Sequence, residues 1–310
     1  MPLKRPPRVR VGISGWTYPP WRGVFYPPHL KHAAELAFAS RVFGSIELNG
    51  SFYSLQRPSS YAAWYQATPA DFVFSVKGGR FITHLKQLRD VDTALANFFA
   101  SGLLNLREKL GPILWQLPPR LSFDADRLER FLELLPYDLA GVERLARRHD
   151  QRLIGRAAVD AQEPNRPVQH TIEVRHPSFV HEQFLQLLQR HGVAICVADS
   201  AGLYPTIDEV TAEFAYVRLH GSERLYVSGY DSDELGAWAA RARAWLSRGL
   251  DVYVYFDNDV KVRAPFDALN LRRVLHGLPV HEPPPTLARV TEEPRTAWVQ
   301  WNGRGLRRRA

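Results

Sequence analysis

The chain has 310 residues, of which 45% are hydrophobic, enough to bury one large core. Its single cysteine, Cys196, excludes a disulfide framework and a cysteine-based metal cluster. No apolar run approaches the roughly 20 residues that span a bilayer. The basic segment 1–10 is not followed by the apolar stretch of a secretory signal. We therefore expect a soluble, cytoplasmic protein without a membrane partner.

The formal net charge of +8 raises the question of nucleic-acid binding. The excess is concentrated at the two ends of the chain, because residues 4–10 and 304–309 each carry four Lys or Arg side chains. Without these eight side chains the remainder is near neutral. A protein with basic ends is therefore the favoured interpretation, and nucleic acid stays a less favoured partner.

Eight short apolar runs, rich in Val, Ile, Phe and Tyr, predict buried strands. They cover residues 9–16, 45–50, 72–78, 111–118, 170–176, 193–199, 214–221 and 251–259. Helical spacing of apolar residues recurs between them, at 31–43, 58–68, 124–135, 178–192 and 232–249. This alternation is typical of a parallel sheet covered by helices. Eight such units in roughly 250 residues predict a single (β/α)8 TIM barrel of the α/β class.

The spacing also predicts where the barrel domain ends. Residues 1–278 form the barrel, and its crossover between the fourth and fifth strands is lengthened by an insertion at 136–169. Residues 279–310 are Pro-rich and then basic, and we interpret them as a C-terminal extension. We expect this extension to be partly ordered where Trp298 and Trp301 can dock.

Polar side chains recur two residues apart near the ends of four predicted strands. The pairs are Glu47 and Asn49, Ser75 and Lys77, Glu173 and Arg175, and Arg218 and His220. Residues two apart in a strand point to the same side, so these pairs are predicted to face the barrel axis and its mouth. Ion pairs that merely plug the mouth are the alternative, although apolar packing is often as stable. We favour a functional pocket at the C-terminal strand ends, where TIM-barrel active sites lie.

The charges of this predicted pocket favour an anionic ligand. Lys77, Arg175 and Arg218 are three cations at separate strand ends. Guanidinium groups bind carboxylate and phosphate through paired hydrogen bonds. The expected partner is therefore a small molecule that carries one of these groups.

Proton transfer is the chemistry that the acidic residues favour. Glu47 and Glu173 are the candidate catalytic groups, and His220 is the natural proton shuttle near neutral pH. A structural histidine at a strand end is the alternative for His220. Asn49 and Gln116 are expected to orient the substrate.

A divalent metal is the rival interpretation of the same strand ends. Its candidate ligands are Glu47, Glu173, His176, Asp199, His220 and Asp257 or Asp259. Arg175 and Arg218 would lie beside that cation and oppose its binding, and the sequence has no HExxH motif. We therefore expect neither a metal nor an organic cofactor.

Aromatic residues are frequent in the segments that follow the predicted strands. They are Trp16, Tyr18, Trp21, Phe25 and Tyr26, then Phe52, Tyr53 and Phe81, and finally Tyr226 and Tyr230. Such a rim could stack a sugar or a base. It could equally rigidify long loops, and the sequence leaves both interpretations open.

Several segments in fixed order resemble the DUF72 family, which includes the YecE-like proteins. They read GISGWTYPPWRGVFYP, IELNGSFYSLQRPSSYAAW, FSVKGGRFITHLKQL, GPILWQLPP, IEVRHPSF, VRLHG and YVYFDND, within residues 9–276. The resemblance implies a TIM barrel and brings no established reaction. By position, the family's motif residues correspond to Trp16, Glu47, Asn49, Phe52, Tyr53, Lys77, Thr83, His84, Gln116, Pro118, Glu173, Arg175 and Asn258.

Two positions depart from the family pattern. The last strand reads YFDND here and commonly YFNND in relatives, so Asp257 adds a negative charge where an amide is usual. Phe179 stands where relatives often carry tryptophan, and we interpret it as a packing residue.

Three functional hypotheses follow. The first is an enzyme that uses acid/base chemistry on a small anionic metabolite, as an isomerase, lyase or hydrolase. The second is a metal-dependent phosphodiesterase or nuclease that acts on nucleic acid. The third is a ligand-binding barrel without catalysis. The first is favoured, and the sequence sets neither the substrate nor the oligomeric state.

Overall fold

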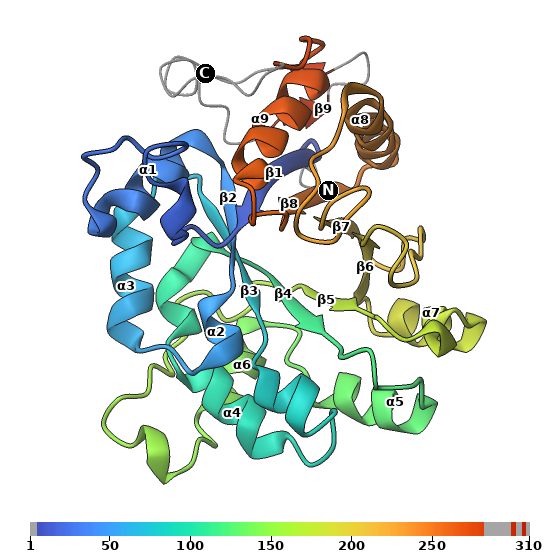
Figure 1. The fold of residues 1–310 in the computed structure, drawn as a ribbon. Helices are drawn as coiled ribbons and strands as arrows, with labels where there is room; N and C mark the ends of the chain where they lie inside the picture. Colours follow the sequence, from blue (N-terminus) through green and yellow to red (C-terminus); the bar gives the residue numbers. More distant parts are fainter. Residues whose placement is uncertain (1–4, 282–298, 302–305, 308–310) are drawn as a thin grey trace. The chain divides into compact units, whose positions relative to one another are not determined.

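The computed structural model describes residues 5–281, 299–301 and 306–307. Eight parallel strands follow one another in chain order (Figure 1). They are β1 (Arg8–Ser14), β2 (Ser45–Leu48), β3 (Val73–Lys77), β4 (Leu110–Gln116), β5 (His170–Glu173), β6 (Ala194–Asp199), β7 (Phe214–Leu219) and β8 (Asp251–Phe256). The sheet closes because β8 pairs with β1, with Val9 opposite Val252 and Ile13 opposite Phe256. The predicted (β/α)8 barrel is confirmed.

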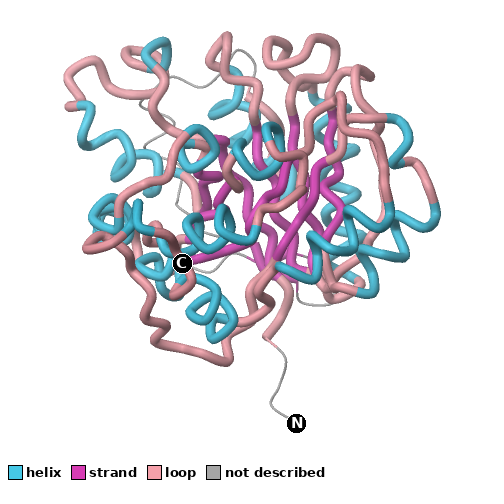
Figure 2. Tube along the Cα trace, turned by 90° about the horizontal axis from the view of Figure 1, so that it is seen from below, coloured by secondary structure: helices cyan, strands magenta, loops and turns pink. Residues whose placement is uncertain are grey.

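The chain forms two compact units. We call residues 47–196 the central unit, and residues 1–46 together with 197–310 the terminal unit. Both boundaries lie inside strands, one in β2 and the other in β6. In each unit helices lie on the outer side of the strands (Figure 2).

The central unit contains six α-helices and four short helical turns within its described residues. The α-helices are α2 (Gly50–Tyr53), α3 (Pro58–Ala67), α4 (Asp92–Ala100), α5 (Ala125–Leu134), α6 (Leu139–Ala146) and α7 (Glu182–Arg190). The turns are η3 (Phe81–Leu85), η4 (Leu103–Lys109), η5 (Gln151–Leu153) and η6 (Pro177–Phe179). Asp124 starts α5 as predicted, because its carboxylate accepts a 3.0 Å hydrogen bond from the Arg127 backbone N–H.

The terminal unit has fewer helices in its described part. They are η1 (Pro19–Trp21), η2 (His32–Ala34), α1 (Glu35–Val42), α8 (Ser232–Ser247) and α9 (Arg263–Leu275). Asp231 and Glu234 form a capping box that fixes the start of α8. The sequence did not predict α9, because it begins after Val262, whose left-handed backbone (φ 58°) offers no side-chain cap. None of the helices in the described ranges has the length and apolar character needed to cross a bilayer.

Part of the C-terminal extension adds strands to the terminal unit. The short strand β9 (Val299–Trp301) pairs antiparallel with the start of β1, and β10 (Leu306–Arg307) pairs with β9. Trp298, which we expected to dock, lies outside the described residues.

Strands β1 and β2 approach so closely at Gly12 that only glycine fits. A Cβ atom there would lie 2.1 Å from the carbonyl oxygen of Ser45. Nearby, the side-chain hydroxyl of Ser45 is bonded to that of Tyr255 at 2.6 Å.

The aromatic segment after β1 is core and not a rim. Trp21, Phe25 and Tyr26 are fully buried, and the Phe25 ring stacks on Phe43 with a centroid distance of 5.9 Å. The Tyr26 hydroxyl donates a 2.7 Å hydrogen bond to the Trp16 carbonyl oxygen. The rim interpretation is therefore wrong for these three rings, which bury their apolar surface.

Three strands end before polar residues that we had assigned to them. β2 ends at Leu48, β5 at Glu173 and β7 at Leu219. Asn49, Arg175 and His220 consequently follow their strands, and Asn49 already has helical backbone angles (φ −88°, ψ −19°) as α2 begins. Asn49 therefore lies beyond the range of the alternation argument. The other two pairs still bring their side chains together, because Arg175 Nε lies 2.8 Å from Glu173 Oε1 and Arg218 Nη1 lies 3.3 Å from His220 Nε2.

Candidate functional site

The candidate residues are divided between the two units. The central unit holds Glu47, Asn49, Tyr53, Lys77, Gln116, Glu173 and Arg175, and the terminal unit holds Trp16, Arg218, His220 and Asn258. We describe each group within its own unit.

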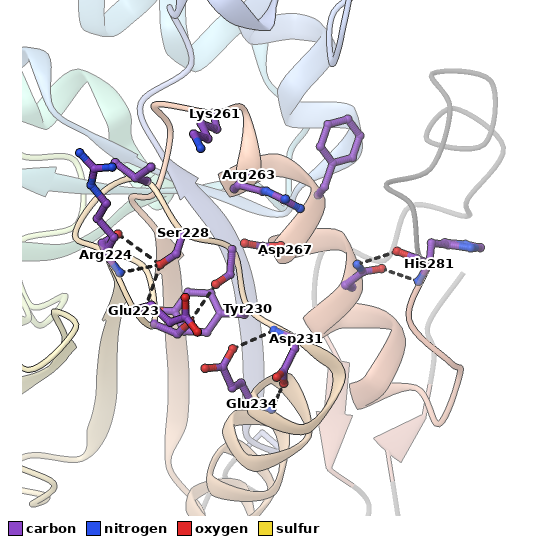
Figure 3. A pocket seen from close by; sticks show the side chains of 15 residues that line it. Glu223, Arg224, Ser228, Tyr230, Asp231, Glu234, Lys261, Arg263, Asp267 and His281 are labelled. Carbon is purple, nitrogen blue, oxygen red and sulfur yellow. Dashed lines mark hydrogen bonds between the residues drawn. The ribbon is translucent and has the colours of Figure 1, made fainter.

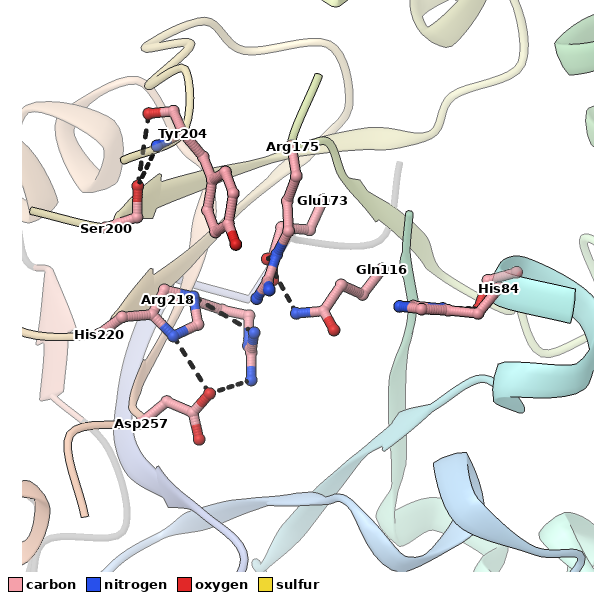
Figure 4. A network of polar contacts seen from close by, with 10 residues as sticks. His84, Gln116, Glu173, Arg175, Ser200, Tyr204, Arg218, His220 and Asp257 are labelled. Carbon is pink, nitrogen blue, oxygen red and sulfur yellow. Dashed lines mark hydrogen bonds and ion pairs between the residues drawn. The ribbon is translucent and has the colours of Figure 1, made fainter. Parts of the chain in front are cut away.

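A buried carboxylate is held by two donors at the end of β5. Glu173 is 1% exposed, and its Oε1 accepts hydrogen bonds from Gln116 Nε2 and from Arg175 Nε, each at 2.8 Å (Figure 4). Gln116 is the last residue of β4 and the register partner of Glu173. We call these three residues the Glu173 cluster. Because both donors meet one oxygen, the carboxylate has a fixed orientation.

Lys77 and His84 lie in the same unit and both contact Phe52. Lys77 is buried at the end of β3, with its ammonium nitrogen 4.5 Å from the centre of the Phe52 ring. The His84 ring meets the same ring edge to face, with centroids 5.0 Å apart. His84 Nδ1 is 2.9 Å from the Thr83 hydroxyl, and the imidazole points toward Gln116 (Figure 4).

His84 is surrounded by positively charged side chains that affect its pKa. Burial lowers its pKa to about 4, with further lowering by the charges of Lys77, Arg175, Arg80 and Arg120. The imidazole is consequently neutral at physiological pH. The sequence offered no strand argument for His84, and only the family resemblance singled it out.

The segment that carries His84 has an unusual backbone. η3 is a π-helical turn, and Gln87, Leu88 and Asp90 follow it with φ values of 49°, 68° and 49°. Left-handed conformations are costly for residues with a Cβ atom and are concentrated at functional segments. Leu88 is buried, and its N–H donates to the Ile82 carbonyl oxygen at 3.0 Å, which holds the turn in place.

The remaining central-unit candidates differ widely in exposure. Glu47 is fully buried in β2, whereas Tyr53 is 71% exposed. Asn49 lies between these extremes, and its buried Oδ1 has no hydrogen-bond partner in the described part of the chain. An unsatisfied buried acceptor is uncommon and is a candidate contact for a ligand donor.

The terminal unit contains a second charged cluster, made of Arg218, His220 and Asp257. Arg218 is fully buried, and its Nη2 donates to Asp257 Oδ2 at 2.7 Å (Figure 4). Arg218 Nη1 lies 3.3 Å from His220 Nε2, and the same Asp257 oxygen lies 3.1 Å from His220 Nδ1. A guanidinium can only donate, so Nε2 of His220 is the acceptor of this contact, and Nδ1 lies on the side of Asp257.

Asn258 links three segments of the terminal unit. It is fully buried after β8, and its Nδ2 donates to the Ser228 carbonyl oxygen at 2.9 Å and to Asp267 Oδ2 at 2.7 Å. Trp16, the other motif residue of this unit, is half-buried in the segment after β1.

A cavity of about 710 Å³ lies beside Asp267 (Figure 3). One wall is the face of α9 with Arg263, Phe266, Asp267 and Asn270, and the opposite wall is the loop 222–231. Asp267 is 4% exposed, and burial raises its pKa to about 7. Sequence reasoning missed this cavity because it did not predict α9.

The proposed metal ligands His220 and Asp257 are in contact, but no third candidate ligand completes a group with them in the described part of the chain. Within the described residues, the structure gathers no group of three or more His, Cys, Asp or Glu side chains that could hold a metal ion. Asp199, one of those candidates, accepts a hydrogen bond from the Ala201 backbone N–H at 3.3 Å, and burial raises its pKa.

Comparison with known proteins decides the family. Residues 10–289 match the family model described as "Protein of unknown function DUF72". The chain belongs to the DUF72 family. It is 21% identical over 280 residues to the UPF0759 protein YunF of Bacillus subtilis, covering 81% of this chain and 89% of that protein. Over 129 residues it is 26% identical to the UPF0759 protein YecE of Escherichia coli K12. That match covers 41% of this chain and 44% of YecE.

Solved structures agree with this DUF72 assignment. A DUF72 family protein from Thermotoga maritima has 27% identity and a TM-score of 0.70, covering 86% of this chain and 99% of that one. A DUF72 family protein from Enterococcus faecalis, with 16% identity and a TM-score of 0.66, shares the fold over 86% and 95% of the two chains.

Proposed function

We propose that this DUF72 protein is an enzyme that binds a small phosphate- or carboxylate-bearing metabolite in its central unit and transfers a proton on it. One observation carries the proposal. The charges of Lys77, Arg80, Arg120 and Arg175 all act on the His84 imidazole and lower its pKa. Four cations within electrostatic reach of one neutral ring favour the binding of an anion beside it.

The geometry of these cations supports direct recognition of the anion. Arg80 and Arg120 are exposed, so an incoming ligand can reach them, whereas Lys77 and Arg175 lie deeper. Arg120 Nη2 donates to the His84 carbonyl oxygen at 2.7 Å, which holds this guanidinium against the π-helical turn. Guanidinium groups bind phosphate and carboxylate more specifically than ammonium groups do.

Glu173 is the proposed proton acceptor. Hydrogen bonds from Gln116 and Arg175 fix one oxygen of its carboxylate, and a fixed carboxylate is a suitable general base. Glu47 is the proposed second proton-exchanging group, and its burial shields it from water. Proton transfer is common to isomerases, lyases and hydrolases. Our proposal names this step and covers all three classes of enzyme.

Within the terminal unit, His220 is a separate candidate proton carrier. His220 is oriented by Asp257, as a catalytic imidazole is oriented by a carboxylate. Arg218, which the sequence suggested as an anion ligand, is fully buried against Asp257. We therefore assign Arg218 to positioning the Asp257 carboxylate.

Calorimetric titration with inorganic phosphate and with small carboxylated metabolites tests the proposal. We expect Arg175→Ala to weaken anion binding about tenfold or more, because it removes a charged hydrogen-bond donor. Arg147→Ala is the matched control, since it removes an exposed arginine that directly follows α6 in the same unit. Unchanged anion binding in Arg175→Ala and in Arg120→Ala would refute the proposal.

Glu173→Gln separates catalysis from binding. For an enzyme, this variant keeps the anion but loses about 10²-fold or more in turnover, because the base is gone. If a metabolite binds tightly yet is never converted, and Glu173→Gln binds it within about tenfold of the wild type, the protein is a binding barrel and not an enzyme.

A further inference from the structure

Large apolar side chains are exposed on two neighbouring segments of the central unit. Tyr53 is 71% exposed at the end of α2, and Phe81 is 48% exposed at the start of η3. Leu55 and Leu85 are exposed on the same two segments. Exposed apolar groups that gather in one place commonly mark a binding surface.

The two segments are fixed to each other. The Ser51 hydroxyl of α2 donates a 2.6 Å hydrogen bond to the Lys77 carbonyl oxygen at the end of β3. A Cβ atom on Gly79, just before η3, would lie 3.8 Å from the Ser51 carbonyl oxygen. The Phe52 ring meets Tyr53 edge to face at 5.1 Å. We call Phe52, Tyr53 and Phe81 the aromatic platform.

Cationic side chains border this platform. The Lys77 ammonium lies over Phe52, and Arg80 directly precedes Phe81 in the sequence. Arg120 is attached to the His84 carbonyl oxygen in the same π-helical turn. Aromatic rings and guanidinium planes both stack on flat heterocycles, and the same guanidinium groups bind phosphate.

We propose that the ligand of the central unit is a mononucleotide, with its base on Tyr53 and Phe81 and its phosphate among the cations beside them. This inference rests on the proposed anion site and names its substrate class. Backbone hydrogen bonds hold the turn that carries Phe81, and Arg120 is attached to the same turn through the His84 carbonyl oxygen, which lowers the entropic cost of binding both ends of one molecule.

The distribution of charge favours a single phosphate over a nucleic-acid strand. Lys77, Arg80, Arg120 and Arg175 all act on one imidazole, that of His84. A strand requires cations in a row, spaced to follow successive phosphates. A simple sugar phosphate would account for the cations, but it would leave the exposed faces of Tyr53 and Phe81 without a role.

Binding of three sets of probes to the full-length protein tests the inference. The probes are inorganic phosphate, ribose 5-phosphate and the four common ribonucleoside 5′-monophosphates. We expect at least one nucleotide to bind about tenfold or more tightly than ribose 5-phosphate, the gain that stacking of one base provides. Phe81→Ala and Tyr53→Ala should each reduce that gain and leave phosphate binding unchanged.

Ile154→Ala is the matched control, because it truncates a 73% exposed apolar side chain of the same unit outside the platform. Equal affinities for ribose 5-phosphate and every nucleotide would overturn the nucleotide inference and leave the anion site intact. Nucleotide binding that Phe81→Ala and Tyr53→Ala do not weaken would also overturn it. Binding of none of the probes would overturn the anion site itself, and binding of a single-stranded oligonucleotide alone would replace the inference with a strand-binding surface.

Discussion

Gln116 and Glu173 are register partners at the ends of β4 and β5, and a 2.8 Å hydrogen bond joins their side chains. The pairing is therefore built into the sheet and does not depend on loop conformation. Parallel strands in register bring their last residues together, which places an amide donor beside a buried carboxylate. Arg175 adds the second donor from the segment that follows β5.

Replacement of Gln116 by methionine should show how much the hydrogen bond to Glu173 contributes to the free energy of unfolding. Gln116→Met keeps the length of the side chain but removes its amide. Of the two hydrogen bonds to Glu173 Oε1 described above, the one from Arg175 is kept. We expect the free energy of unfolding to fall by about 1–3 kcal/mol, the usual cost of removing one partner of a buried charged acceptor. Urea unfolding measures this loss.

Gln186→Met is the control for that measurement. Gln186 makes an exposed hydrogen bond to Glu182, and a surface substitution usually changes stability by less than about 0.5 kcal/mol. Equal losses in the two variants would show that the Gln116–Glu173 bond has no special role.

Anion binding should be linked to proton uptake by His84. The charges of Lys77, Arg80, Arg120 and Arg175 help to lower the His84 pKa to about 4, and a bound anion offsets them and raises that pKa. Linkage then requires the anion to bind more tightly as pH falls from about 6 to about 4. Titration with sulfate, which does not itself change charge in this range, measures the effect.

His84→Gln tests whether this imidazole is the linked group. The variant should still bind sulfate but lose most of the pH dependence, because glutamine does not titrate. A pH dependence that is identical in the variant would assign the linked proton to another group.

Asp267 should make the protein less stable as pH rises toward neutrality. Burial raises its pKa to about 7, compared with about 3.9 in an unfolded chain. Between these values the folded state binds more protons than the unfolded state, so the free energy of unfolding falls as pH increases. Asp267→Asn removes this contribution and should stabilise the protein relative to the wild type, by up to about 1.4 kcal/mol per pH unit across that window.

Thermal unfolding at pH values from about 4 to 8 checks this prediction. Asp208→Asn serves as the control, because Asp208 is an exposed carboxylate paired with Arg241 in the same unit. The prediction would be contradicted if stability changed with pH in the same way in the wild type and in Asp267→Asn.

The strands could be predicted from sequence because buried strands require runs of apolar residues. All eight runs of Val, Ile, Phe and Tyr became strands of the barrel. Their ends were less predictable, because polar residues such as Asn49 and Arg175 continue the apparent alternation after the strand has ended. The helix α9 was missed since a left-handed Val262 takes the place of a polar cap.

The candidate site was predictable in part. Gln116 and Glu173 could be named because they lie near the C-terminal ends of predicted strands, and the structure joins them. The importance of His84 could not be derived, because a π-helical turn and three left-handed residues follow no helical or strand period. Burial of Trp21 and Phe25 could not be told from an exposed rim by composition.

The division of the chain has a consequence for the order of folding. The central unit is one continuous segment, whereas the terminal unit is assembled from both ends of the chain. Its pairing of Val9 with Val252 must wait until β8 has been synthesised. At roughly 5–20 residues per second, ribosomal synthesis leaves β1 without this partner strand for some ten seconds or longer. The central unit is therefore fully synthesised before β1 can pair with β8.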